Sequence, residues 1–312
     1  MDVTGTKRAG APEIGVVHLI RRQNGLAPFE RFLASYREYP AGMPHDLVLI
    51  FKGFPFGLGT QDYDRLLADM PHRRMYLADY GFDLRPYFKA VEQFDYRYFC
   101  FLNSFSRILD ANWLAKLYRW ITVDGIGLVG VAGSYESFSE NRAERANMLA
   151  KVGWVEKLRW RLGHLSSDPN PRVIARRALV WLAESIGLKN PKENFPSFPN
   201  FHIRTNAFMS SRQILSQIHV GLTVFKWAAY AMESGLNSLT NQVTHLGLRP
   251  LVVARTGESF EKEQWHVSDT FRQSRQQNLL IADNQTDAYL AANAADRAML
   301  SKRAWGRFSR PA

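Results

Sequence analysis

A carboxylate in an apolar setting is the first group in the sequence that could do chemistry. Glu233 follows Ala-Tyr-Ala-Met and precedes Ser234-Gly235. Apolar surroundings make a carboxylate a better proton acceptor, and a glycine lets a ligand approach the backbone closely. Glu233 therefore fits a general base that deprotonates a hydroxyl group. The alternative is a carboxylate held in a salt bridge at a helix end, and Glu136 is a second candidate for the base.

Polar side chains also follow apolar runs of the first half of the chain. They are Arg21, Asn24, Lys52, Asp79, Asp83, Asn103 and Ser104. If these runs are parallel strands, the polar residues gather beyond the carboxyl ends, where open sheets bind ligands. Two alternatives stay open: Asp79 and Asp83 as helix caps and turn formers, and Asn103-Ser104 as a simple turn.

An alternating polar triplet lies later in the chain. His202, Arg204 and Asn206 would share one face of a strand, lining either a cleft or a solvent-facing edge. A bound anion needs cations or hydrogen-bond donors nearby. The candidates are Lys52, Arg21, Arg204, His266 and Arg272, of which Lys52 stands out because it follows a buried strand directly.

The elements that must position these residues alternate between strand and helix. Apolar runs predict strands over 14–20, 46–51, 74–78, 96–102 and 126–131. Helical spacing predicts helices between them, the last one capped by Asp110. This alternation indicates an α/β fold: a largely parallel sheet with helices on both faces.

The rest of the sequence is predicted to be mainly helical, with a strand over 248–254 and a final helix over 283–304. We expect a flexible lead (1–13), a single domain (14–305) with a helical insert (137–198), and a basic tail (306–312). Basic, Trp-bearing segments of the insert suit the headgroup zone of an anionic membrane. They suit equally a helix packed on the sheet with a solvated basic rim.

The composition excludes several classes of protein. The single cysteine, Cys100, excludes an intrachain disulfide and a CxxC metal site, and the sequence has no phosphate-binding glycine loop, Gly-x-Ser-x-Gly elbow or zinc-hydrolase motif. The net charge of +11 favours an anionic partner. A nucleic acid is not expected, because no reader motif is present and much of the charge lies in the insert and tail. Without a signal peptide or a spanning segment, we expect a cytoplasmic protein.

One segment resembles a known family. Phe101-Leu-Asn-Ser-Phe-Ser-Arg-Ile-Leu109, followed by Trp113-Leu114, resembles GT-A-fold glycosyltransferases and is similar to the family 2 bacterial polysaccharide enzymes. In that family the segment reads Leu-Asp-x-Asp, and its carboxylates hold a divalent metal on the donor diphosphate. Here the positions are Asn103 and Phe105. The resemblance therefore implies a nucleotide-diphospho-sugar donor, whereas Mg²⁺ or Mn²⁺ is not firmly implied.

Other segments extend the resemblance over about residues 14 to 305. It implies donor contacts from His18 to Asn24 and from Asp79 to Asp83, and an acceptor-facing strand over 198–209. Glu233-Ser234 resembles the Glu-Asp pair of which one acid deprotonates the acceptor in inverting enzymes.

A late segment completes the resemblance, since Trp265-His266 with Arg272 resembles a basic and aromatic motif that reaches the diphosphate. The implied function is inverting glycosyl transfer to a glycan or lipid-linked acceptor in surface polysaccharide synthesis, such as lipopolysaccharide. The enzyme would be peripheral on the inner face of the membrane. The alternative is a catalytically inactive GT-A-like binding subunit of a polysaccharide assembly complex, because both metal carboxylates are missing.

Overall fold

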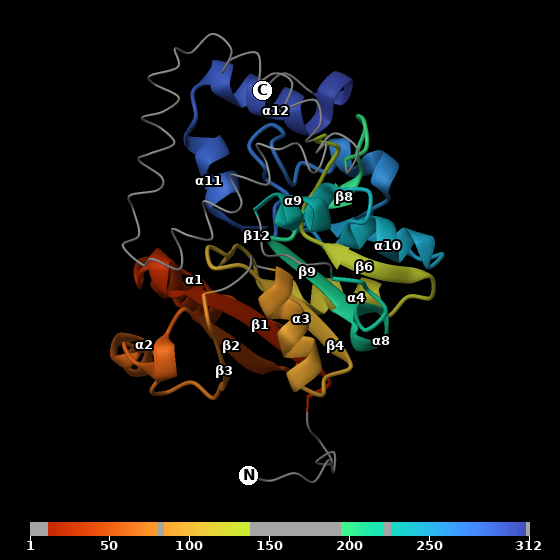
Figure 1. The fold of residues 1–312 in the computed structure, drawn as a ribbon. Helices are drawn as coiled ribbons and strands as arrows, with labels where there is room; N and C mark the ends of the chain where they lie inside the picture. The colour runs from red at the N-terminus through yellow and green to blue at the C-terminus, as the bar shows by residue number, and fades with distance from the viewer. Residues whose placement is uncertain (1–11, 80–83, 138–194, 221–225, 310–312) are drawn as a thin grey trace, which may run out of the picture.

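The computed structural model describes residues 12–79, 84–137, 195–220 and 226–309 (Figure 1). Most of the predicted lead, nearly all of the predicted insert, Asp83 and the end of the tail lie outside the described residues. None of the described helices is long and apolar enough to cross a membrane.

Eight strands of the described chain form one sheet in the order β11-β10-β6-β9-β4-β1-β2-β3. Their bounds are β1 Ile14–Arg21, β2 Asp46–Lys52, β3 Arg73–Leu77, β4 Tyr98–Leu102, β6 Ile126–Gly130, β9 Ala207–Ser211, β10 Arg249–Val253 and β11 Ser259–Phe260. Only β9 and β11 pair antiparallel with their neighbours in it. The predicted α/β class with a mostly parallel sheet is confirmed.

The strand directions place the ends of six strands at one edge of this sheet. Strand β9 is antiparallel to both β4 and β6, so these two run the same way. The remaining parallel pairs add β1, β2, β3 and β10 to that direction. We call the side where these six strands end the carboxyl edge and the side where they begin the amino edge.

Helices cover both faces of the sheet because side chains alternate along each strand. On β4, Phe101 packs against Tyr87 of α3 (Leu84–Gln93) with ring centroids 4.8 Å apart. Tyr98, an odd number of residues away, packs instead against Tyr118 of α4 (Trp113–Ile121) at 5.3 Å. The described helices are α1 Ala27–Glu38, α2 Gln61–Leu66, α3 Leu84–Gln93, α4 Trp113–Ile121, α8 Arg212–Leu215, α9 Lys226–Ser234, α10 Leu239–His245, α11 Asn284–Ala291 and α12 Ala294–Trp305.

Short elements complete the described fold. Two small antiparallel pairs lie outside the main sheet, β5 (Arg107–Ile108) with β12 (Ile281–Ala282) and β7 (Gly133–Ser134) with β8 (His202–Ile203). The 3-10 turns are η1 Arg22–Asn24, η2 Pro55–Gly57, η4 Lys262–Val267 and η5 Gly306–Phe308. In Figure 1, α11 and α12 lie in the upper part of the view, and β2 and β3 lie in its lower part.

Two predicted helix boundaries are wrong. Asn112, not Asp110, stands at the start of α4, and the Asp110 carboxylate instead accepts from Lys116 Nζ at 2.6 Å. The predicted final helix is two helices, α11 and α12. It breaks because the Asn293 side chain accepts a hydrogen bond from the Asp296 amide at 2.9 Å and so starts a new helix.

The predicted continuous strand through the polar triplet is also wrong. Strand β8 ends at Ile203, the chain turns at Thr205-Asn206, and β9 begins at Ala207. The Arg204 amide donates to the carbonyl of Ala132 at 3.0 Å, so the chain stays beside the β7 segment as far as Arg204. Asn206 lies beyond this pairing, in the turn. The alternation along the sequence therefore does not place Asn206 on the same strand as the other two.

Candidate active site

The carboxyl edge brings together three of the residues predicted to contact the nucleotide-sugar donor. Arg21 ends β1, Lys52 ends β2, and Asp79 follows β3. Arg21 donates to Asp79 through Nε at 3.2 Å and Nη2 at 3.3 Å, and Lys52 Nζ lies 3.7 Å from the same carboxylate. A two-pronged guanidinium–carboxylate contact fixes both partners. We call these residues the strand-end cluster.

Local packing explains why the strand-end cluster forms. Lys52 is only 1% exposed, so its charge needs a partner near the sheet. Gly53 turns the chain with φ +84°, and a side chain there would meet Asp79 Cβ at 3.2 Å. Its amide binds the Leu77 carbonyl at 2.8 Å, which holds the ends of β2 and β3 together. The turn after β2 thus brings Asp79 beside Lys52.

The segment after β4 forms a turn through its own side chain. Asn103 Oδ1 accepts from the Phe105 amide at 2.9 Å and from Ser106 Oγ at 3.2 Å. The Asn103 amide binds the Asn206 carbonyl at 2.9 Å, so this turn adjoins the one between β8 and β9. Ser104, within the turn, is buried. The turn formation that the sequence left open for Asn103 is therefore present.

Farther along the same edge lies a second group, the central polar cluster. We define it as Glu136, Asn200, His202, Arg204, Glu233, Arg272 and Asp283. Glu136 follows β7, His202 and Arg204 belong to or follow β8, Glu233 lies in the last turn of α9, and Asp283 starts α11. Residues up to 147 positions apart in sequence thus surround one polar region.

Asn200 connects, through backbone carbonyls, the two segments that carry Glu136 and Glu233. Its amide nitrogen donates to the Ser234 carbonyl at 2.6 Å and lies 3.3 Å from the Glu136 carbonyl. Its own carbonyl lies 2.8 Å from His202 Nδ1, which holds the proton on that nitrogen. Burial lowers the pKa of His202, although the nearby Glu233 charge opposes that shift. His202 is therefore a neutral ring held in one orientation.

The Glu233 carboxylate is held from the backbone. Its Oε1 accepts from the Thr205 amide at 3.1 Å, in the turn that separates β8 from β9. The second carboxylate oxygen is not used in this bond. A carboxylate anchored at one oxygen keeps the other for a proton from a bound hydroxyl group.

Arg204 and Asp283 form a buried ion pair. Arg204 Nη2 donates to Asp283 Oδ2 at 2.9 Å, and the side chains are 7% and 2% exposed. The other oxygen, Oδ1, accepts from the amides of Gln285 and Thr286 and so caps α11. The Arg204 guanidinium lies over the Phe271 ring, 4.0 Å from its centroid. The pair links β8 to the first turn of α11.

Arg272 approaches from the loop after η4 and pairs with Glu136. Its Nη1 lies 3.1 Å from Glu136 Oε2, and its backbone φ is +48°. Burial lowers the pKa of Arg272, while the Glu136 charge opposes that shift. The second candidate for the base, Glu136, is therefore held as the counterion of an arginine.

The remaining predicted site residues lie apart from these clusters. His18 is fully buried, stacked on Phe32 with ring centroids 3.7 Å apart, and burial lowers its pKa to about 3. Trp265 is also fully buried and fills the space beside Gly133, where a side chain would meet its ring at 2.4 Å. The structure places both rings in the apolar core, out of contact with solvent.

Two other predicted residues lie nearer the surface. Asn24 is the last residue of η1, partly exposed beyond β1. His266 lies next to Tyr135 and Phe308, with its ring centroid 4.9 Å from that of Phe308. Phe308 belongs to the segment predicted as a basic tail, so this part of the tail packs beside the site.

Asn103 and Phe105, which stand where the family has its metal-binding carboxylates, do not fit a divalent cation. Asn103 Oδ1 is already engaged in its own turn, and Phe105 offers no ligand atom. In the described part of the chain no three His, Cys, Asp or Glu side chains are grouped so that they could hold a metal ion. We therefore derive no step through a metal.

Sequence reasoning missed two residues of the central polar cluster, Asn200 and Asp283. Each contacts partners distant in sequence, as Asp283 does Arg204. A helix cap was the only readable signal for Asp283, which precedes Asn284-Gln-Thr. No spacing in the sequence points to Asn200.

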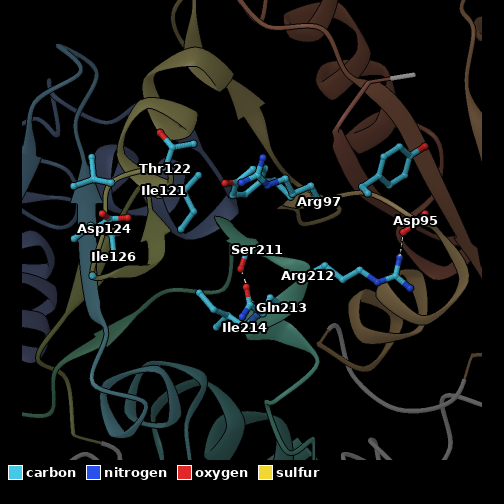
Figure 2. Close-up of a pocket in the computed structure, with 14 residues that line it drawn as sticks. Asp95, Arg97, Ile121, Thr122, Asp124, Ile126, Ser211, Arg212, Gln213 and Ile214 are labelled. Atoms are coloured by element: carbon cyan, nitrogen blue, oxygen red, sulfur yellow. Dashed lines mark hydrogen bonds and ion pairs between the residues drawn. The ribbon is translucent and has the colours of Figure 1, made fainter. Parts of the chain in front are cut away.

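A separate pocket of about 440 Å³ opens at the amino edge (Figure 2). It is lined by the start of β4, the chain between α4 and β6, and the end of β9 with the start of α8. None of the predicted site residues lines it. This pocket therefore lies at the opposite edge of the sheet from the predicted site residues.

No protein-family model and no curated protein matches this sequence. Among solved structures, the chain is similar to the mannosyltransferase PcManGT from Pyrobaculum calidifontis in complex with GDP-Man and Mn²⁺. The TM-score is 0.44 at 12% identity, over 78% of this chain and 55% of that chain. This chain therefore spans about half the length of PcManGT.

TarS from S. aureus gives two further matches. Its 1–349 structure has a TM-score of 0.31 at 13% identity, over 38% of this chain and 35% of that chain. A longer TarS structure has a TM-score of 0.28 at 14% identity, over 38% and 21%. The likeness to GT-A glycosyltransferases that the sequence predicts is met by structural similarity at low sequence identity.

Proposed function

We propose that this chain transfers a sugar, with inversion, from a nucleotide-diphospho-sugar to a hydroxyl group of a glycan or lipid-linked acceptor in surface polysaccharide synthesis. One observation supports this most: Glu233, anchored by the Thr205 amide at 3.1 Å, lies beside a neutral, oriented His202. The buried Arg204 is two residues from His202 on the same segment. A base near cations is what such a transfer requires.

In the proposed reaction, Glu233 accepts the proton of the acceptor hydroxyl group. The acceptor oxygen forms a bond to the anomeric carbon while the bond from that carbon to the diphosphate oxygen breaks. The nucleoside diphosphate leaves with the electron pair, and nearby cations stabilise its charge. The candidates are Arg21, Lys52, Arg204, His266 and Arg272. We expect the reaction on the cytoplasmic side of the membrane.

The test begins with the donor. Thermal-shift screening with UDP-, GDP-, TDP- and CMP-sugars, with and without Mg²⁺ or Mn²⁺, identifies which nucleotide binds. Release of nucleotide in the presence of a surface-glycan extract then measures transfer. Glu233→Gln is expected to lower the rate by about 10²–10⁴-fold, the usual contribution of a general base. Glu92→Gln, an exposed carboxylate on α3, is the matched control and keeps the wild-type rate.

The outcomes separate two functions. Full transfer by a folded Glu233→Gln variant removes Glu233 as the base, and Glu136→Gln then tests the second candidate. Binding of a nucleotide-sugar without transfer favours the inactive binding subunit. The engaged Asn103 side chain and the apolar Phe105, in place of two carboxylates, support that second candidate function.

A further inference from the structure

Aromatic rings gather at the protein surface beside the central polar cluster. Tyr135 lies at their centre, with its ring centroid 4.7 Å from that of Phe201 and 5.8 Å from that of Phe308. Phe308 also packs on His266, with ring centroids 4.9 Å apart. Tyr135 is 1% exposed, whereas Phe201, His266 and Phe308 are each partly exposed. One buried ring thus supports three rings that water still reaches.

Two cations lie over these rings. Lys262 Nζ is 5.7 Å from the centroid of Phe201, and Arg307 Cζ is 5.1 Å from that of Phe308. The Lys262 side chain is 43% exposed, and Arg307 is exposed as well. Glu263 opposes part of this charge, because its carboxylate lies 3.8 Å from Lys262 Nζ. Aromatic faces and positive charge are therefore presented together.

This surface also carries an exposed aliphatic side chain, because Val267 follows His266 and is 37% exposed. Exposed apolar side chains that lie next to one another mark interaction surfaces more often than single ones do. We define the aromatic–basic patch as Phe201, Lys262, His266, Val267, Arg307 and Phe308.

The end of the chain adds to the positive charge near the patch. From Arg297 onward the sequence has five basic residues and no acidic one. Among them, Lys302 is exposed on α12, which leads directly into Arg307 and Phe308. A second copy of this chain would bring like charges together at the patch, whereas an anionic surface would attract them. The charge therefore favours an anionic partner over self-association.

The patch adjoins the candidate active site along the chain. Tyr135, which supports its rings, directly precedes Glu136, and Phe201 directly precedes His202. Both neighbours belong to the central polar cluster. A partner on the patch would therefore lie beside the segments that carry the proposed acceptor chemistry.

Hydrogen bonds fix the patch relative to these segments. The Tyr135 hydroxyl group donates to the Lys262 carbonyl at 2.6 Å, which ties η4 to the chain after β7. The Tyr135 amide donates to the Ala304 carbonyl at 2.9 Å, which ties the end of α12 to the same residue. Three distant segments thus present the patch as one unit.

We propose that the aromatic–basic patch lies against the headgroups of an anionic lipid bilayer. Aromatic rings and the aliphatic stems of lysine and arginine suit the boundary between headgroups and acyl chains, while the charges attract anionic lipids. The contact rests on the proposed function in one respect: a lipid-linked acceptor would reach Glu233 from the bilayer beside it.

The test measures co-sedimentation of the full chain with vesicles of equimolar phosphatidylcholine and phosphatidylglycerol. We expect binding that pure phosphatidylcholine does not give and that added salt weakens, because salt screens the attraction to the headgroups. Lys262→Gln with Arg307→Gln should weaken binding roughly 25-fold, since each charge near an anionic membrane contributes about fivefold. Val267→Gln should weaken it several-fold, because apolar contact is lost.

Two further variants serve as controls. Arg65→Gln with Arg97→Gln removes the same net charge from side chains that are 79% and 68% exposed elsewhere, and should bind like the wild type. Lys262→Arg with Arg307→Lys keeps both charges of the patch and should also bind like the wild type. This second pair separates the loss of charge from a folding defect.

Three results would overturn the membrane contact. They are the absence of binding to the anionic vesicles, equal weakening by the Arg65 and Arg97 control, and a dimer in lipid-free solution that the Lys262→Gln, Arg307→Gln variant dissociates. The last would assign the patch to a second copy of the chain. Patch-dependent vesicle binding without sugar transfer removes the proposed function and keeps the contact. Sugar transfer by a chain that binds no vesicles does the reverse.

Discussion

The two edges of the sheet satisfy their polar side chains differently. At the amino edge, in the pocket of Figure 2, Arg212 donates to the Phe94 carbonyl at 2.7 Å and to Asp95 at 2.9 Å. At the carboxyl edge, Arg204 is 5% exposed and keeps Nη1 without an acceptor among the described residues. A solvated donor costs little, whereas a buried unpaired one is costly. A buried donor without an acceptor among the described residues therefore distinguishes the carboxyl edge from this part of the amino edge.

The largest effect on stability should come from the Arg204–Asp283 pair. Arg204→Met leaves the Asp283 carboxylate buried without its counterion, and breaking one partner of a buried pair costs about 3–5 kcal/mol. The free energy of unfolding, measured by urea titration, should fall by that amount. Arg204→Met with Asp283→Leu removes both charges and should recover part of the loss, although Asp283→Leu also removes a helix cap. A loss below about 1 kcal/mol would show that the ion pair at the carboxyl edge contributes no more to stability than the exposed pair at the amino edge.

His18 gives a second comparison, because it is a buried polar group with no charged neighbour. Its folded pKa of about 3 lies below the ordinary value of 6.5, so only the unfolded chain takes up a proton between these pH values. The stabilisation is present above pH 6.5 and is lost as the pH falls, by about 1.4 kcal/mol per pH unit.

The test compares the free energy of unfolding at pH 7 and pH 4.5. His18→Leu should flatten the pH dependence by about 2–3 kcal/mol over this range. The exposed His219 provides a control, and His219→Gln should keep the wild-type slope. Parallel slopes for wild type and His18→Leu would mean that the ring is reached by solvent.

The smallest effect is expected at the amino edge. Arg212→Met removes an ion pair whose side chains are 37% and 78% exposed. Exposed pairs contribute about 0–1 kcal/mol, because water and salt screen them. The free energy of unfolding should therefore change by no more than about 1 kcal/mol, and nucleotide release should stay at the wild-type rate. A loss like that of Arg204→Met would remove the contrast between the edges.

The strands were the most predictable part of the fold. Runs such as 14–20 and 46–51 are mostly apolar and buried, and such runs specify a strand wherever helices cover both faces. The break between α11 and α12 was missed because Asn293 acts through one side-chain hydrogen bond, which apolar periodicity does not register. Local polar contacts thus decided the boundaries that apolar patterns left open.

The candidate site was predictable only where strand ends determine it. Arg21, Lys52 and Asp79 gather because parallel strands end at one edge. The turn at Thr205-Asn206 could not be predicted from the alternation of polar residues, because it depends on the pairing of β8 with β7. Asn200 contacts residues far away in sequence, so only the folded chain reveals its place in the site. The assignments to donor and acceptor remain predictions, to be tested as described above.

The Asp283 carboxylate has one further consequence, which concerns amide exchange. One of its oxygens receives the amide protons of Gln285 and Thr286, and the other receives Arg204. These two protons can exchange with D₂O only when the cap opens, and Arg204 holds the carboxylate of the cap in place. Their exchange rates therefore report, from the first turn of a helix, on whether Arg204 stays paired with Asp283 when a nucleotide-sugar is added.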